Sequence, residues 1–137
     1  MTTHLVIPDP HVKMGTSNDR FTWAGKFAKE LNPDIVICLG DWVNMDSLSH
    51  FDRGKKAFEG RRYRKEIDHA EEALELFNSS FKNKKTRKIM LGGNHEHRIT
   101  RFVEDNPELE GTLSVDDIPF AKYGWEYHDY EKIIELD

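Results

Sequence analysis

The fold of this chain is decided by residues 35–41, which read IVICLGD. Residues 5–11 (LVIPDPH) and 89–95 (IMLGGNH) follow the same plan, in which an apolar run ends in polar residues. Short apolar runs of this kind predict buried strands of a parallel sheet. Because the carboxyl ends of parallel strands lie along one edge, where ligands bind in open α/β sheets, we expect the three polar ends to converge on one site.

The segments between these runs predict helices. One helix is expected over about residues 19–31 and another over about residues 65–81, because apolar residues recur there at steps of three and four. A third, polar helix is predicted to start near Glu96. On the first helix, the residues expected to share one face are Phe21, Ala24, Phe27, Ala28 and Leu31. The alternation of strands and helices predicts an α/β fold of βαβ units around a largely parallel sheet.

Two segments break this alternation. Residues 41–63 are long, polar and irregular, which is typical of functional or mobile loops. Residues 125–127 and 131–136 predict two short strands of a hairpin joined near Asp129. Because the sequence stops directly after the second strand, we expect a single domain over residues 1–137 that is incomplete at its C-terminus.

Length and composition narrow the class of protein. The 137 residues suit one compact domain, and 37% of them are hydrophobic. No apolar run approaches the roughly 20 residues of a membrane span, and no secretory signal is visible, so no membrane partner is expected. The single cysteine, Cys38, lies inside an apolar run and predicts a small buried hydrophobic residue. A cytoplasmic location fits this cysteine usage.

Charge is distributed unevenly along the sequence. Seven Lys or Arg residues lie between positions 53 and 65, and five lie between positions 82 and 88, although the net charge is -5. From residue 104 to the end, there are eleven acidic residues and only two lysines. The basic stretches either attract a nucleic acid through its phosphates or form an ordinary solvated surface, and the sequence leaves both interpretations open.

The three polar ends carry the chemistry. Taken separately, each is compatible with a turn or a helix cap. Taken in order, Asp9-Pro10-His11, Gly40-Asp41-Trp42-Val43-Asn44 and Gly93-Asn94-His95-Glu96 resemble the motifs of the calcineurin-like metallophosphoesterase family. The resemblance implies hydrolysis of phosphate esters by a hydroxide that two metal ions activate. It also implies two packed sheets flanked by helices, and this chain would lack the C-terminal strands.

The resemblance also implies a set of metal ligands. Asp9 and His11 would hold the first metal, Asp41 would bridge both metals, and Asn94 would supply an amide oxygen to the second. Such mixed nitrogen and oxygen ligands suit Mn, Fe, Zn, Co or similar divalent ions.

His95 has a different role in the family pattern. It would lie beside the metals and donate a proton to the leaving oxygen or stabilise the charged phosphate. The family often places an aspartate at the position of Asn44, so we expect the side-chain carbonyl of Asn44 to accept the N–H of His95. Asn94 and His95 would also contact substrate, and His97 and Arg98 are further candidates for substrate contacts.

The sequence departs from the family pattern after these motifs. The family adds three more histidine ligands, two of them from a Gly-His-x-His motif. This sequence has no Gly-His pair and only His128 beyond His97. The second metal site is therefore expected to be impaired.

Two hypotheses stay open. The first is a phosphoesterase acting on a phosphodiester, nucleic acid included, or on a phosphomonoester. Its missing ligands would come from a complementing C-terminal segment or from an oligomer partner. The second is a catalytically incomplete fragment that acts as a binding module.

Overall fold

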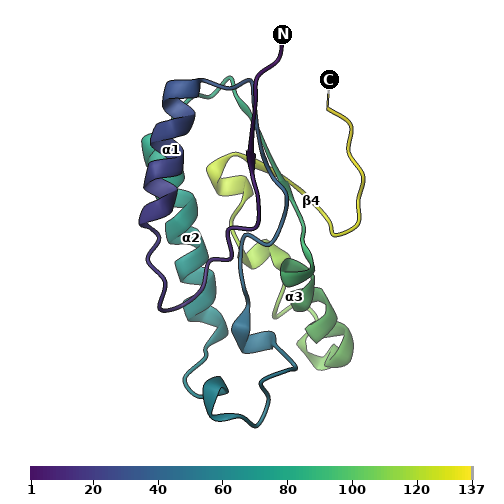
Figure 1. The fold of residues 1–137 in the computed structure, drawn as a ribbon. Helices are drawn as coiled ribbons and strands as arrows, with labels where there is room; N and C mark the ends of the chain where they lie inside the picture. Colours follow the sequence, from purple (N-terminus) through teal and green to yellow (C-terminus); the bar gives the residue numbers. More distant parts are fainter. Residues whose placement is uncertain (137) are drawn as a thin grey trace.

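The computed structural model describes residues 1–136, which form a four-stranded sheet in the order β1-β2-β3-β4 (Figure 1). The strands are β1 (His4–Ile7), β2 (Ile35–Cys38), β3 (Arg87–Leu91) and β4 (Trp125–His128), and all neighbouring pairs are parallel. The helices are α1 (Asp19–Leu31), α2 (Tyr63–Ser80) and α3 (Asn94–Asp105), which follow β1, β2 and β3 in turn. The predicted α/β fold of βαβ units is confirmed. The described residues form one sheet, so the second sheet that the resemblance implies is not represented among them.

Helices α1 and α2 pack together over one face of the sheet (Figure 1). The large cluster of buried side chains lies between them and this face, and it includes Trp42, Phe77 and Trp125. Each strand contributes alternate residues to this cluster, as the two-residue period of a strand requires. Cys38 is buried within it, as the sequence predicted.

The buried face of α1 is narrower than its sequence predicted. Phe21 and Ala28 are buried as expected, whereas 54% of Phe27 and 39% of Leu31 is exposed. Gly25 explains the difference, because a Cβ at this position would lie 2.6 Å from the carbonyl oxygen of Phe77 on α2. The close approach at Gly25 turns α1 so that Phe27 and Leu31 lie away from the core.

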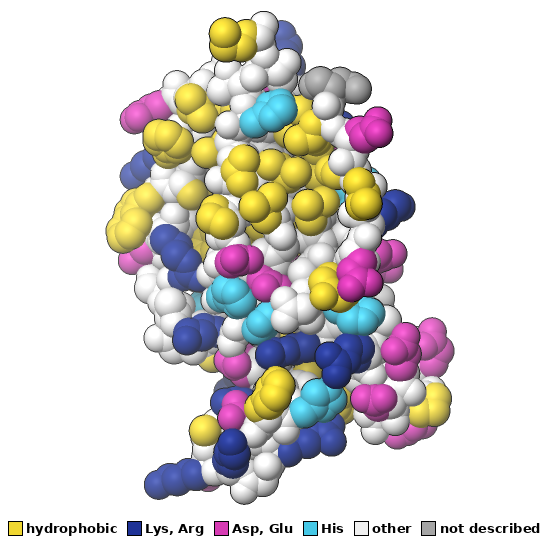
Figure 2. Space-filling view, turned by 45° about the vertical axis from the view of Figure 1, so that its right-hand side comes forward, with side chains coloured by type: hydrophobic (Ala, Val, Ile, Leu, Met, Phe, Trp, Pro, Cys, Tyr) yellow, Lys and Arg dark blue, Asp and Glu magenta, His cyan; other side chains and the backbone are white. Residues whose placement is uncertain are grey.

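The opposite face of the sheet is also apolar. Ile35, Ile37 and Ile89 form a second buried cluster there, and Ile134 and Leu136 of the C-terminal segment pack against it. Figure 2 shows hydrophobic side chains gathered on the upper part of the molecule, above a band of histidine and acidic side chains. The C-terminal segment therefore covers part of the sheet face that α1 and α2 leave open.

The predicted C-terminal hairpin is wrong. Residues 125–128 do form a strand, but β4 pairs in parallel with β3, and residues 131–136 form no strand. After β4 the chain reverses and runs back beside the sheet (Figure 1). Ile134 and Leu136 pack against the apolar face of the sheet. Within the described residues, this segment is therefore held by side-chain contacts and not by backbone hydrogen bonds to β4.

Irregular segments connect the remaining elements. The long polar segment after β2 contains the 3-10 helices Asp46–Leu48 and Lys56–Phe58, and the connection from α3 to β4 contains three more. Those three are Pro107–Leu109, Val115–Asp117 and Ala121–Tyr123. Among the helices of residues 1–136, none combines the length and the apolar character that a bilayer crossing needs.

Candidate metal centre

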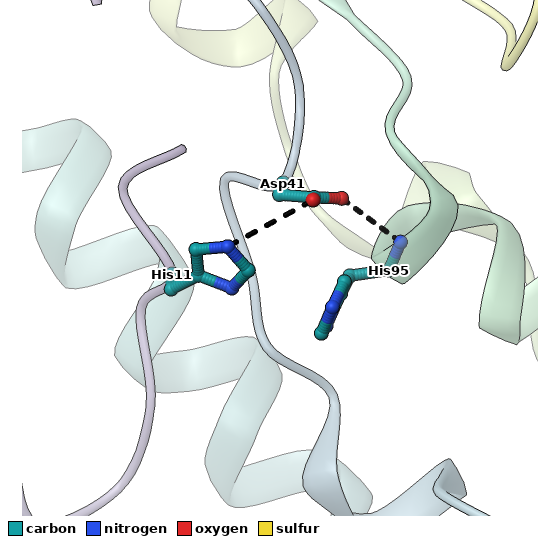
Figure 3. Close-up of side chains that lie close together, drawn as sticks. All are labelled: His11, Asp41 and His95. Carbon is teal, nitrogen blue, oxygen red and sulfur yellow. Dashed lines mark hydrogen bonds and ion pairs between the residues drawn. The ribbon is translucent and has the colours of Figure 1, made fainter. Parts of the chain in front are cut away.

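Three loops bring polar side chains together at the carboxyl edge of the sheet (Figure 3). His11 follows β1, Asp41 follows β2, and His95 lies in the first turn of α3, close after β3. One possible ligand atom from each of these side chains lies within 4.8 Å of the other two. The ring centroids of His11 and His95 are 4.7 Å apart in an edge-to-face arrangement. The edge of the sheet thus gathers two imidazoles and one carboxylate.

Backbone hydrogen bonds join the loops that follow β1 and β2. The amide of His11 donates to the carbonyl of Asp41 at 2.8 Å, and the amide of Val12 donates to the carbonyl of Trp42 at 2.7 Å. In the opposite direction, the amide of Asn44 donates to the carbonyl of Val12 at 2.9 Å. These bonds extend the parallel pairing beyond the strands, so the two loops hold their side chains at a fixed separation.

The candidate ligands have an unusual backbone. Asp9, His11 and Asp41 have positive φ angles of 32°, 46° and 52°. Side-chain-bearing residues adopt this left-handed region rarely, at a free-energy cost that the surrounding structure must outweigh. Such strain concentrates at functional sites. The backbone conformation of these three residues, like their side-chain chemistry, therefore indicates a functional site.

Two glycines allow the loops after β2 and β3 to meet. Gly40 has a φ of +104°, and a Cβ on it would lie 2.9 Å from the backbone of Gly93. A Cβ on Gly93 would clash with the carboxylate and the amide nitrogen of Asp41. The amide of His95 donates to Oδ1 of Asp41 at 3.0 Å across this contact. The glycines of the second and third motifs are therefore needed for the approach of Asp41 to α3.

The side chain of Asn44 determines which ring nitrogen of His11 carries the hydrogen. Its Oδ1 lies 2.9 Å from Nδ1 of His11, and its Nδ2 donates to Oδ1 of Asp46 at 2.6 Å. Because the amide oxygen faces the imidazole, Nδ1 of His11 carries the hydrogen, and Nε2 keeps its lone pair. Nε2 lies 3.8 Å from Oδ2 of Asp41. His11 thus presents a free nitrogen beside a carboxylate, as a metal ligand should.

The backbone of Asn44, and not its side chain, orients His95. Nδ1 of His95 lies 2.7 Å from the main-chain oxygen of Asn44. The predicted bond from His95 to the amide side chain of Asn44 is therefore wrong, because that amide is already engaged by His11 and Asp46. A carbonyl acceptor still fixes the hydrogen on Nδ1, so Nε2 of His95 is the nitrogen left for chemistry.

Asn94 lies directly against the carboxylate of Asp41. The end of its amide that faces Asp41 is 3.3 Å from Oδ1 and 3.1 Å from Oδ2. With the amide nitrogen at that end, Asn94 donates to the carboxylate. With the amide oxygen there, three oxygens face one another, an arrangement that a cation between them stabilises. Together with Nε2 of His11, these atoms fit a mixed nitrogen and oxygen donor set for a divalent ion.

Asp9 stands apart from this group. It is exposed, and its carboxylate is not among the ligand atoms that cluster with His11, Asp41 and His95. Its charge nevertheless lies near the end of β2: burial raises the pKa of the Cys38 thiol to about 12, and Asp9 and Asp41 add to that shift. The structure therefore places Asp9 beside the centre without bringing it into contact.

The two further candidates for substrate contacts have different surroundings. Nη1 of Arg98 donates to the main-chain oxygen of Asn44 at 2.9 Å, the same oxygen that accepts from His95. Arg98 thus lies beside the centre. The ring of His97 instead packs 5.0 Å from the ring of Tyr130, after β4. The structure directs His97 toward the C-terminal segment.

Glu96 is a residue of the third motif to which sequence reasoning gave no role. It is fully buried, and its Oε1 accepts from the amide of Trp42 at 2.7 Å, while Oε2 has no hydrogen-bond partner among residues 1–136. Burial raises the pKa of this carboxyl to about 8, an effect that the bond from Trp42 opposes. Glu96 joins α3 to the residue after Asp41. In the sequence, the only indication of this role is that Glu96 directly follows the Asn94-His95 pair of the third motif.

The two basic stretches lie at opposite ends of the molecule. Residues 53–65 precede and begin α2, on the side of the carboxyl edge, whereas residues 82–88 follow α2 and enter the amino end of β3. In the second stretch, Lys88 donates to Asn78 and to the carbonyl of Tyr123, and Arg87 pairs with Glu126. Only the first stretch is therefore placed to act together with the metal centre.

Comparison with known proteins agrees with this geometry. The sequence model of the calcineurin-like phosphoesterase family matches residues 3–135, nearly the whole chain. The chain therefore belongs to the calcineurin-like phosphoesterase family. No curated protein matches it. Membership implies a metal-dependent hydrolase that acts on phosphate esters, and the structure gathers His11, Asp41 and His95 into a group that could hold a metal ion.

Proposed function

We propose that this protein binds divalent cations at the carboxyl edge of its sheet and hydrolyses phosphate esters there. The observation that carries the proposal is the convergence of His11, Asp41 and His95 within 4.8 Å. Asn94 faces Asp41 from the first residue of α3, and Asp9 lies beside the same edge. The substrate is a phosphodiester or a phosphomonoester.

Each side chain has a task that follows from its contacts. Nε2 of His11 and the carboxylate of Asp41 would hold one cation, and the same carboxylate together with the amide oxygen of Asn94 would hold a second. Asp9, whose exposed side chain lies beside this edge, would complete the first set by turning toward it. Mn, Fe, Zn or Co ions suit these donors, and two such ions would supply an activated water and offset the charge of the phosphate.

His95 is placed to handle the leaving group. Its Nδ1 hydrogen is held by the main-chain oxygen of Asn44, so a proton on Nε2 can pass to the departing alkoxide. Arg98 donates to the same carbonyl and brings a positive charge beside His95. This arrangement stabilises negative charge on the leaving oxygen, whichever ester is cleaved.

A second candidate function is cation binding without turnover. It is favoured by the donor count: among the residues described, Asp41 and Asn94 are the proposed donors for the second cation. Further donors would come from a complementing C-terminal segment or an oligomer partner. A chain that binds one cation and releases no product would fit this second function.

The test combines metal content with turnover. Purified protein is loaded with Mn²⁺, its metal content is measured by mass spectrometry, and p-nitrophenyl phosphate and bis-p-nitrophenyl phosphate are supplied in turn. Release of p-nitrophenolate that depends on Mn²⁺ and is lost in His95→Ala supports the hydrolase. Glu104→Gln, an exposed change at the far end of α3, serves as the control. One bound ion and no release from either ester would overturn hydrolysis and favour the binding module.

A further inference from the structure

Helix α3 leads away from the metal centre and carries arginines along one face. His95 lies in its first turn, and Arg98 and Arg101 follow at steps of three, which puts all three residues on neighbouring positions of the same face. Nη1 of Arg98 donates to the main-chain oxygen of Asn44 at 2.9 Å, and Nη2 of Arg101 lies 3.2 Å from Nε2 of His50. This face of α3 therefore lies along the segment that runs from Asn44 to His50.

A third arginine reaches the same place from the long loop. The guanidinium of Arg53 lies 5.6 Å from the centre of the Phe102 ring on α3. Among the residues described, no carboxylate pairs with Arg53, Arg98 or Arg101, whereas the neighbouring Arg61 is paired with Asp52 at 2.8 Å. These three guanidinium groups thus form no ion pair within the described chain, and they make a strip of positive side chains beside the centre.

An exposed aromatic side chain lies next to this strip. Phe51 stands between His50 and Arg53 in the sequence, and it is 77% exposed. A phenylalanine that contacts so little of its own protein offers a flat apolar surface to a ligand. Figure 2 shows Lys and Arg side chains, a histidine and a hydrophobic side chain directly below the band of histidine and acidic side chains.

We propose that Arg98, Arg101, Arg53 and Phe51 form a track for a single-stranded nucleic acid. Guanidinium groups recognise backbone phosphates without regard to sequence, and an exposed aromatic ring stacks on an unpaired base. The proposal rests on the proposed hydrolysis and narrows its substrate to a phosphodiester within a single strand. The strand lies along α3, its scissile phosphate is at the metal centre, and Phe51 holds a base that a double helix would keep in its own stack.

The test is a binding measurement that needs no turnover. Fluorescence anisotropy of a fluorescein-labelled ten-residue oligothymidylate is followed at low salt in EDTA, so that failure of hydrolysis cannot affect the result. We expect Phe51→Ala to weaken binding by about fivefold or more, the loss of one stacked base. We expect Arg53→Gln/Arg101→Gln to weaken it at least tenfold and to reduce the salt slope by about 1.4, the value for two phosphate contacts on a single strand.

Matched controls come from elsewhere on the surface. Trp23→Ala removes another exposed aromatic ring, 65% exposed on α1, and Lys84→Gln/Lys85→Gln removes two charges at the opposite end of the molecule. Both controls should bind within twofold of the wild type, and a duplex of the same length should be insensitive to Phe51→Ala. No binding by the wild type, equal losses in track and control variants, or equal loss for duplex and single strand would each overturn the track. If the protein hydrolyses phosphate esters but does not bind the oligothymidylate, the track is refuted and the proposed hydrolysis stands.

Discussion

The two edges of the sheet use polar residues in opposite ways. At the amino edge they satisfy one another: Asp34 accepts from the amide of Thr3 at 2.8 Å, and Arg87 pairs with Glu126 at 2.9 Å. At the carboxyl edge, His11 and His95 each have one ring nitrogen fixed by Asn44, and the other makes no hydrogen bond to the described part of the chain. Paired groups stabilise a fold, whereas a ring nitrogen that is held in place without a partner is available to a ligand or to a proton in transfer.

The backbone shows the same contrast. Asp9, His11 and Asp41 at the carboxyl edge all have positive φ angles, and two glycines let their loops meet. At the other edge, positive φ angles fall on Asn32, the residue that caps the end of α1, and on Gly124, residue types that tolerate this region, and the strands pair in regular parallel register. Matched substitutions at the two edges should therefore have unequal effects.

The largest difference is expected between Asp41→Asn and Asp34→Asn. Asn tolerates the left-handed backbone of Asp41, so the change removes a charge and a shared ligand while it keeps the shape. We expect kcat/KM for bis-p-nitrophenyl phosphate with Mn²⁺ to fall at least about 1,000-fold, or about 4 kcal/mol of transition-state stabilisation. Asp34→Asn should leave kcat/KM within twofold. Equal kinetics in both variants would show that the edges do not differ in function.

The next difference concerns the pH dependence of stability. The carboxyl of Glu96 keeps its proton in the folded protein up to about pH 8, whereas the unfolded chain releases it near 4.5. The folded state therefore binds more protons between these values, and the stability contributed by neutral Glu96 is lost as pH rises. Between pH 5 and pH 8 the free energy of unfolding of the wild type should fall by about 3 kcal/mol relative to Glu96→Gln.

Glu126 supplies the control for this measurement. Its pairing with Arg87 lowers its pKa, so its contribution is present above the unfolded pKa and is lost only as pH falls below that range. Glu126→Gln should consequently follow the wild type between pH 5 and pH 8 in urea titrations. A Glu96→Gln variant that also follows the wild type would mean that Glu96 is ionised in the fold.

The smallest effect is expected from Arg87→Ala at the amino edge. The ion pair with Glu126 is bidentate, but both side chains are substantially exposed, and solvent screens such a pair. We expect the free energy of unfolding to change by about 1 kcal/mol or less. Thermal denaturation in low and high salt would measure it. A loss of several kcal/mol would show that the amino edge carries more of the stability than its pairing indicates.

The sequence predicted what local chemistry determines. The first three strands, their parallel pairing and the convergence of His11, Asp41 and His95 follow from apolar runs that end in polar residues, whereas Asp9, predicted to bind a metal with His11, lies outside the group. The role of the Asn44 main-chain oxygen could not be predicted, because a backbone acceptor leaves no trace in residue identity. The exposed Phe27 and the missing hairpin had another cause. Both depend on contacts between distant segments, at Gly25 with α2 and at Ile134 with the sheet face.

The most direct test of the metal centre is a crystal structure of the protein grown with Mn²⁺ and measured at the manganese absorption edge. The account predicts anomalous density between Nε2 of His11, the carboxylate of Asp41 and the amide of Asn94, with the amide oxygen turned toward the metal. Anomalous density elsewhere on the molecule, with none at the carboxyl edge, would contradict it.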